Sequence, residues 1–187
     1  MENPQLIKKI KMKIGVLSDS HDNISHLNEA FQIFNREKVV ITFFLGDLTL
    51  APTLAAFRQS EAPVKAVFGN LDQDKKNILE KIKNEDINVQ YPPGEGLKWD
   101  LMINGKRVCV FHGHNSQVDE DRVKSGIFDF VFRGHTHWPK VEKIGKTLLV
   151  NPGGICGWAD LERKPVKPSL AIVSLHPPQA EIISLMP

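Results

Sequence analysis

The segment IGVLSDSH, residues 14–21, decides the fold, because an apolar run typical of a buried strand ends in an aspartate and a histidine. Four later segments repeat this arrangement: ITFFLGD (41–47), VKAVFGN (64–70), VCVFHGH (108–114) and FDFVFRGHTH (128–137). A strand that is buried on both faces has no room for a charged side chain until the chain leaves the sheet. The sequence therefore predicts five strands that bring polar side chains to one edge of an α/β fold.

The polar residues at these strand ends belong to the types that bind metal ions. They are seven carboxylate, carboxamide and imidazole side chains: Asp19, His21, Asp47, Asn70, His112, His135 and His137. Ligands of open α/β sheets bind beyond the carboxyl ends of the strands, so we expect these side chains to converge. An isolated Asp or His after a strand is usually a cap or a solvated loop residue, but seven at matched positions favour a two-metal hydrolytic centre.

Length and charge predict one domain with a local binding site. The chain has 187 residues, and we expect residues 1–187 to form a single domain in which residues 1–11 are a lead-in to the first strand. The net charge is +2, from 24 basic and 22 acidic residues, so no broad field attracts nucleic acid or membrane. Any anionic substrate must therefore be recognised by local contacts, and nucleic acid is not expected as a general binding partner.

The cysteine content favours a reducing, cytoplasmic setting. Two cysteines, Cys109 and Cys156, do not suggest a disulfide framework, and no segment has transmembrane length or the apolar stretch of a secretory signal. Cys109 alternates within VCVF and is expected to be a buried small hydrophobe. Cys156 has two interpretations, a structural thiol, which we favour, and a thiol that approaches the metals.

Secondary-structure patterns divide the chain into two halves. Strands alternate with helical patterns in the first half, which predicts parallel βαβ units, whereas the second half is mostly β with a hairpin turn at Asn104-Gly105. Helices are expected at about 24–37 with Asn23 as the cap, 52–57, 73–83 and 118–125. Further strands are expected near 128–132, 140–144, 147–150, 169–175 and 179–185, and residues 159–168 look like an exposed, mobile loop.

Five motifs, in this order, resemble the signature of calcineurin-like metallophosphoesterases: Asp19-x-His21, Gly46-Asp47, Gly69-Asn70, His112-Gly-His114 and Gly134-His135-Thr136-His137. The match spans residues 13–154, and GNLD at 69–72 and NPGG at 151–154 resemble the compact, cap-less branch of bacterial and archaeal phosphodiesterases. The resemblance implies a four-layer α/β/β/α sandwich with two facing mixed sheets. It also implies a metal-dependent phosphodiesterase that uses in-line attack by a metal-bridging hydroxide.

The resemblance further implies how the ligands divide between two divalent ions. The first ion would be held by Asp19, His21 and His137, the second by Asn70, His112 and His135, and Asp47 would bridge them. Such a set without thiolate suits Mn, Fe, Zn, Co or Ni, and we expect Mn to activate best. Catalytic roles are expected for Asp47, Asn70 and His114.

One departure from the family pattern concerns the leaving group. Many larger members carry a histidine directly after the asparagine, placed to protonate the leaving group, whereas this chain has Leu71. The absence favours substrates that need little proton assistance, such as aryl phosphodiesters. His114 is the nearest substitute donor, and phosphate contact or support of a ligand are equally open roles for it. Asp72 is expected to orient a ligand or to cap the next helix.

Several residues near the motifs are left outside the expected site. Trp138, directly after His137, is the best candidate among the three tryptophans for lining a substrate groove. We expect surface positions for Arg133, His26 and His176.

A second interpretation is a metal-binding protein-interaction scaffold, because the chain also resembles the small retromer subunit in size and topology. A scaffold predicts decayed metal ligands, whereas all seven are present here. Hydrolysis is therefore favoured, and an exposed apolar surface would revive the scaffold or indicate a homo-oligomer.

Overall fold

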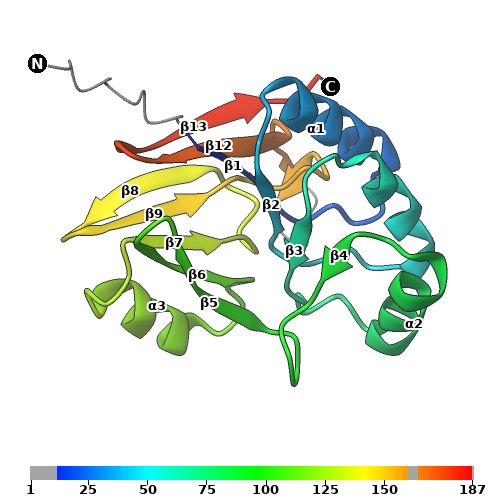
Figure 1. Ribbon diagram of the computed structural model, residues 1–187, viewed down its shortest axis with the longest axis horizontal. Helices are drawn as coiled ribbons and strands as arrows, with labels where there is room; N and C mark the ends of the chain where they lie inside the picture. The colour runs from blue at the N-terminus through cyan, green and yellow to red at the C-terminus, as the bar shows by residue number, and fades with distance from the viewer. Residues whose placement is uncertain (1–11, 160–163, 187) are drawn as a thin grey trace, which may run out of the picture.

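Two mixed β-sheets face each other in the computed structural model, which describes residues 12–159 and 164–186 (Figure 1). The six-stranded sheet has the order β13-β12-β1-β2-β3-β4. Its strands are β1 (Lys13–Leu17), β2 (Ile41–Phe44), β3 (Val64–Ala66), β4 (Val89–Gln90), β12 (Ser169–Leu175) and β13 (Pro178–Ser184). Strands β1 to β3 run parallel, as the sequence predicts, β4 continues this parallel order, and β12 and β13 add an antiparallel edge.

The second sheet has five strands in the order β5-β6-β7-β9-β8. They are β5 (Lys98–Ile103), β6 (Lys106–Phe111), β7 (Phe130–Arg133), β8 (Lys140–Ile144) and β9 (Thr147–Asn151). The three central strands are parallel and the two outer strands antiparallel. Parallel central strands in both sheets place their carboxyl ends at the same side of the molecule, where the motifs of the sequence emerge.

Helices cover the outer face of each sheet (Figure 1). They are α1 (Ile24–Arg36), the 3-10 helix η1 (Ala51–Gln59) and α2 (Lys75–Glu85) on the first sheet, and α3 (Ser116–Lys124) on the second. Asn23 caps α1 as expected, since its side-chain oxygen accepts a hydrogen bond from the His26 N–H at 3.1 Å. The four-layer α/β/β/α sandwich expected from the resemblance is confirmed.

Three buried apolar clusters fill the spaces between the layers. Phe43 and Phe132 lie in the cluster between the sheets, with ring centroids 5.6 Å apart. Phe31 and Phe57 join α1 and η1 over the first sheet, with ring centroids 5.2 Å apart. Cys109 lies in the cluster beneath α3, as expected for a buried small hydrophobe. Packing on both faces holds the strands rigid, so the loops that leave them have fixed starting points.

Some local predictions were wrong. The segment 159–168 was expected to be an exposed loop, but Ala159 is fully buried. In addition, β10 (Trp158–Ala159) pairs with β11 (Lys164–Pro165). Residues 160–163 and the lead-in 1–11 lie outside the described residues. The short β4 was not expected. None of the helices in the described ranges combines the length and apolarity needed to cross a membrane.

Candidate metal centre

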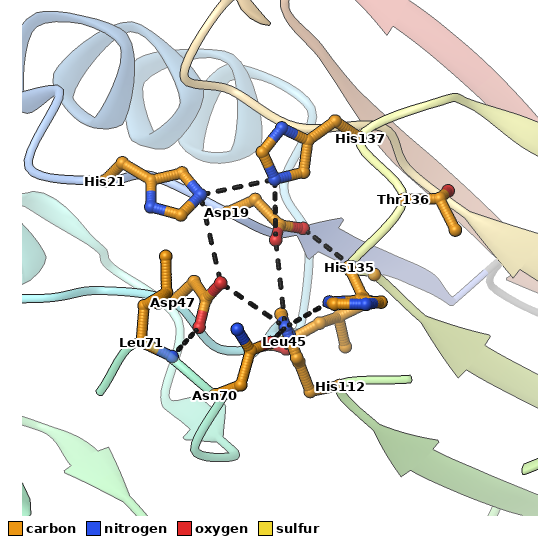
Figure 2. Close-up of polar contacts among 12 residues, drawn as sticks. Asp19, His21, Leu45, Asp47, Asn70, Leu71, His112, His135, Thr136 and His137 are labelled. Atoms are coloured by element: carbon orange, nitrogen blue, oxygen red, sulfur yellow. Dashed lines mark hydrogen bonds and ion pairs between the residues drawn. The ribbon is translucent and has the colours of Figure 1, made fainter. Parts of the chain in front are cut away.

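The seven side chains singled out in the sequence converge at the carboxyl ends of β1, β2, β3, β6 and β7 (Figure 2). His112 lies at the centre of one half of the cluster. Its Nε2 is 3.0 Å from Asn70 Oδ1, 3.3 Å from His135 Nδ1 and 3.4 Å from Asp47 Oδ2. The ends of four strands that are far apart in the sequence thus bring potential ligand atoms to one point.

His137 lies at the centre of the other half. Its Nε2 is 3.2 Å from Asp19 Oδ1 and 3.2 Å from His21 Nε2. The same His21 Nε2 is 3.9 Å from Asp47 Oδ2. Asp47 therefore faces both halves of the cluster with one carboxylate oxygen, as Figure 2 shows.

The backbone that carries these ligands turns sharply where each strand ends. Asp19, His21, Asp47, His135 and His137 all have left-handed conformations, with φ between 42° and 70°. Non-glycine residues in this region are uncommon and strained, and they collect at functional sites where the surrounding structure enforces them. This repeated strain at the predicted ligands is independent support for a functional centre.

Two glycines allow the close approach of neighbouring loops. A Cβ atom on Gly69 would lie 2.1 Å from Asp47 Oδ1, and one on Gly134 would lie 1.9 Å from Ser18 Oγ and 2.8 Å from Asp19 Oδ2. Both positions are too close for any side chain. The glycines of the GN and GHTH motifs are therefore needed to seat the two carboxylates.

Hydrogen bonds behind the imidazoles fix which nitrogen faces the centre. His112 Nδ1 is 2.7 Å from the Leu45 carbonyl oxygen, and His137 Nδ1 contacts the Trp158 carbonyl oxygen. A carbonyl oxygen can only accept, so both Nδ1 atoms donate and both Nε2 atoms point into the cluster. Outer hydrogen bonds of this kind orient histidine ligands at metal sites.

The electrostatics of the cluster fit a bound cation. Asp19 is fully buried, and its Oδ1 accepts no hydrogen bond, while its Oδ2 accepts one from the His135 N–H at 3.0 Å. Burial alone would lower the pKa values of His112 and His137, but the Asp47 and Asp19 carboxylates outweigh it and raise them to about 9 and about 11. The centre thus stabilises positive charge, and its carboxylate oxygens and inward-facing imidazole nitrogens are donor types suited to metal ions.

Asp72 holds two of the ligand loops from behind. Its carboxylate accepts hydrogen bonds from the backbone N–H groups of Asp47 at 2.9 Å, Thr49 at 2.9 Å and Gly69 at 2.7 Å. Burial raises the pKa of this carboxyl, and the backbone donors oppose that shift. Helix α2 is capped by Asp74 instead. Of the two roles expected for Asp72, the structure thus supports orientation of a ligand.

His114 and Leu71 lie at the rim of the cluster. The exposed His114 ring is 5.5 Å from that of His112 and 6.3 Å from that of His135, measured between centroids. Burial and the nearby His112 lower the pKa of His114. Leu71 donates its backbone N–H to Asp47 Oδ1 at 2.8 Å and leaves its side chain 40% exposed. The Leu71 backbone thus holds Asp47, while its side chain lies beside His21 and is partly open to solvent.

Three expectations about neighbouring residues need correction or refinement. The tryptophan beside the site is Trp158, whose ring is 4.6 Å from that of His21, whereas Trp138 is 55% exposed. His26 is half-buried and its Nδ1 is 2.6 Å from the Ile155 carbonyl oxygen, so it is not a surface residue. Cys156 Sγ lies 3.4 Å from His137 Nδ1, behind the ligand. No local pattern marked Trp158, because the approach of the 151–158 segment to β1 is a tertiary contact.

The other two residues expected at the surface, Arg133 and His176, are each half-buried, so the surface prediction holds only in part for both. Arg133 is half-buried and donates to Glu120 Oε1 at 3.3 Å, outside the cluster. His176 is half-buried, with its Nε2 3.1 Å from the Asn104 carbonyl oxygen. Neither side chain takes part in the cluster.

Residues 12–176 match the Calcineurin-like phosphoesterase superfamily domain. The chain belongs to this family. A phosphodiesterase of Methanocaldococcus jannaschii is 33% identical over 147 residues, which cover 79% of this chain and 86% of that protein. A probable metallophosphoesterase of Methanothermobacter thermautotrophicus is 28% identical over 151 residues, covering 76% of each chain. The family predicted from the motifs is confirmed.

Solved structures show the same fold. One described as a novel archaeal phosphodiesterase has a TM-score of 0.81 at 29% identity and covers 93% of this chain and 100% of its own. Vps29 of Entamoeba histolytica complexed with Zn²⁺ has a TM-score of 0.60 at 15% identity, covering 93% and 98%. The latter similarity shows the fold alone. Family membership implies divalent metal ions, and the similarities together support a metal-dependent hydrolase of phosphate esters.

Proposed function

We propose that the chain is a dinuclear-metal-dependent phosphodiesterase. The observation that carries the proposal is the position of Asp47, whose Oδ2 is 3.4 Å from His112 Nε2 and 3.9 Å from His21 Nε2, between the two halves of the cluster. A carboxylate shared by two dications screens their mutual repulsion. The similarity to phosphodiesterases supports a diester as the substrate.

In this proposal the two halves of the cluster correspond to two ions. The residues that would hold the first are Asp19, His21 and His137, those that would hold the second are Asn70, His112 and His135, and Asp47 would bridge. The buried Oδ1 of Asp19, which lies 3.2 Å from His137 Nε2 and accepts no hydrogen bond, supports the first site. The second is supported by the Asn70 oxygen and the His135 nitrogen, which both lie within 3.3 Å of His112 Nε2.

When bound, the two ions would activate a water molecule and neutralise negative charge on the phosphoryl oxygens. The chain's own residues orient the substrate and complete the site. Asn70 is exposed at the rim, where its amide can donate to a phosphate oxygen while Oδ1 faces His112. His114, whose ring is 5.5 Å from that of His112 at the rim of the cluster, is proposed as a proton donor to the leaving group or as a phosphate contact.

Manganese is proposed as the best activator. The seven ligands are carboxylate, carboxamide and imidazole groups, and Cys156 contacts the outer nitrogen of His137. A set that mixes oxygen and imidazole ligands suits Mn²⁺, with Ni²⁺, Zn²⁺, Fe²⁺ or Co²⁺ as alternatives. The enzyme is proposed to act in the cytoplasm on a small phosphate ester, with nucleic acid only as a diester substrate, and the homo-oligomer stays a prediction.

The substitution Asp47→Asn tests the bridging role. The amide keeps the shape but removes the charge that two ions share, so we expect fewer than two bound ions and a loss of activity of roughly a hundredfold or more. Asp121→Asn is the matched control, because Asp121 is exposed on α3. Metal content by elemental analysis and diester turnover are measured on both. Full metal content with full activity in Asp47→Asn would show that the bridging role is wrong.

A further inference from the structure

We infer that the metal centre lies between two cavities, each of which holds one ester group of the phosphodiester substrate. The inference rests on the proposed function and adds a substrate class to it. The two cavities are named here the His114 cavity and the Trp158 cavity. They meet the cluster at different ligands, His112 and His21.

The His114 cavity has a volume of about 730 Å³. It lies between β5, β6, the first turns of α3 and the segment 92–97. Its wall includes Leu97, Leu101, Phe111, His114, Asn115 and Arg122, and it reaches the centre at His112. The wall is largely apolar, as expected for a pocket that removes an organic group from water.

The Trp158 cavity has a volume of about 660 Å³ and reaches the centre at His21. Leu50 and Leu71 supply its apolar wall and are 52% and 40% exposed. The Trp158 ring, 4.6 Å from the His21 ring, forms another part of the wall. Large apolar side chains left exposed next to a metal centre are suited to contact with a substrate.

The two cavities flank Asp47 from opposite sides. Figure 2 shows His21 and Leu71 on one side of the Asp47 carboxylate and His112 on the other. A phosphate bound at the centre directs its ester oxygens away from the metal-facing oxygens, so two substituents can enter two cavities. A monoester would leave one cavity filled only by water. The arrangement therefore favours diesters that carry an organic group on both oxygens.

The polar groups of the cavities differ, which predicts two different substituents. The half-buried Arg122 side chain has no hydrogen bond or ion pair within the described part of the chain. The Arg122 charge acts to lower the pKa values of the Asp100 and Asp119 carboxyl groups without a hydrogen bond to either. The Asp119 carboxylate already accepts a hydrogen bond from the Asn115 N–H at 3.1 Å. The wall of the His114 cavity carries Lys98 and Arg122 beside the carboxylates of Glu95, Asp100 and Asp119, whereas the wall of the Trp158 cavity carries the carboxylates of Asp22 and Asp74. An acceptor or anionic group on the substituent thus fits the His114 cavity, beside Arg122.

Filling each cavity with a tryptophan tests the inference. Asn115→Trp fills the His114 cavity without loss of a cap, because the Asn115 side chain makes no capping hydrogen bond. Leu50→Trp fills the Trp158 cavity from an exposed position. Met102→Trp is the matched control, since Met102 is 65% exposed on β5 outside both cavity walls. Metal content and thermal unfolding of all three variants are compared with those of the unmodified chain.

We expect both cavity variants to lower kcat/KM for bis(p-nitrophenyl) phosphate by roughly tenfold or more relative to the Met102 variant, because an aryl group loses its buried surface. With methyl p-nitrophenyl phosphate only one cavity variant should be impaired, because only one aryl group needs space. Equal activity in all three variants, or equal loss on both substrates, would overturn the inference. If the unmodified chain hydrolyses no diester with any metal, the proposed function fails instead.

Competitive inhibition tests Arg122 separately. Arg122→Met is expected to weaken inhibition by 4-carboxyphenyl phenyl phosphate by roughly tenfold and to leave inhibition by diphenyl phosphate unchanged, because only the former offers a carboxylate. Lys124→Met on the same helix is the control, since Lys124 pairs with Glu120 and lies outside the cavity wall. Equal effects of Arg122→Met on both inhibitors would refute the role of its guanidinium.

Discussion

Replacement of Asp72 by asparagine isolates the contribution of a residue that touches no ligand atom of the cluster. The Asp72 side chain is 1% exposed, and its two oxygens accept three backbone N–H groups at 2.7–2.9 Å. Asparagine has the same shape but one acceptor oxygen. If that oxygen takes the place of Oδ2, the N–H groups of Asp47 and Gly69 keep a neutral partner, and the Thr49 N–H faces an amide that can only donate.

The magnitude follows from these contacts. A donor left without a partner costs about 1–3 kcal/mol, and replacement of a charged acceptor by a neutral one weakens each of the two other hydrogen bonds by about half. Burial disfavours the charged form of Asp72 and raises its pKa. The neutral asparagine avoids this cost, which offsets part of the loss. We expect a net decrease of about 1–3 kcal/mol in the free energy of unfolding of metal-free protein. Metal affinity should fall by about 10- to 100-fold, as for other residues that orient ligands.

Urea unfolding and competition with a chelator measure the two quantities. Asp74→Asn is the matched control, because Asp74 caps α2 through its backbone and makes no side-chain capping hydrogen bond. It should change the free energy of unfolding by less than about 0.5 kcal/mol. The reasoning is refuted if Asp72→Asn and Asp74→Asn have the same stability and the same metal affinity.

Three further outcomes follow from contacts in and around the centre. Gly69→Ala should lower the free energy of unfolding by about 1–3 kcal/mol and weaken metal binding, because its Cβ would lie 2.1 Å from Asp47 Oδ1. Unchanged stability in urea unfolding would contradict this prediction. Leu71→His should raise kcat for alkyl phosphodiesters, whose leaving groups need a proton, more than for aryl ones; equal effects on both would argue against proton donation. In the native chain a thiol reagent at pH 8 should label Cys156 and spare Cys109, because burial raises the pKa of Cys109 to about 12. Mass spectrometry of the labelled peptides measures this, and rapid labelling of Cys109 would contradict its burial.

The convergence of the ligands could be predicted because it follows from a general property of parallel strands. Asp19, Asp47 and His112 each follow an apolar run, and parallel neighbours in a sheet end at the same edge. Asp19 and Asp47 follow β1 and β2, which are neighbours in the first sheet, whereas His112 follows β6 of the facing sheet. That two sheets face each other was implied by the family resemblance, and the periodicity of single strands does not contain it.

Features that depend on contacts between distant segments could not be predicted. Trp158 reaches His21 because the 151–158 segment crosses over β1, where the Ile155 N–H donates to the Ser18 carbonyl oxygen at 3.0 Å. No local pattern marks that crossing. The start of α2 was misplaced for a similar reason. The Asp72 carboxylate binds the loops after β2 and β3, so the helix begins later, at Lys75.

The most direct test of the central claim is turnover by metal-stripped protein to which single metals are returned. The substrates are bis(p-nitrophenyl) phosphate and p-nitrophenyl phosphate, and bound metal is counted in parallel. The two-metal account predicts no activity without metal, recovery that is best with Mn²⁺, two ions per chain and preference for the diester. Two bound ions without turnover of either substrate would contradict hydrolysis and favour the scaffold, whereas failure to bind any metal would contradict both.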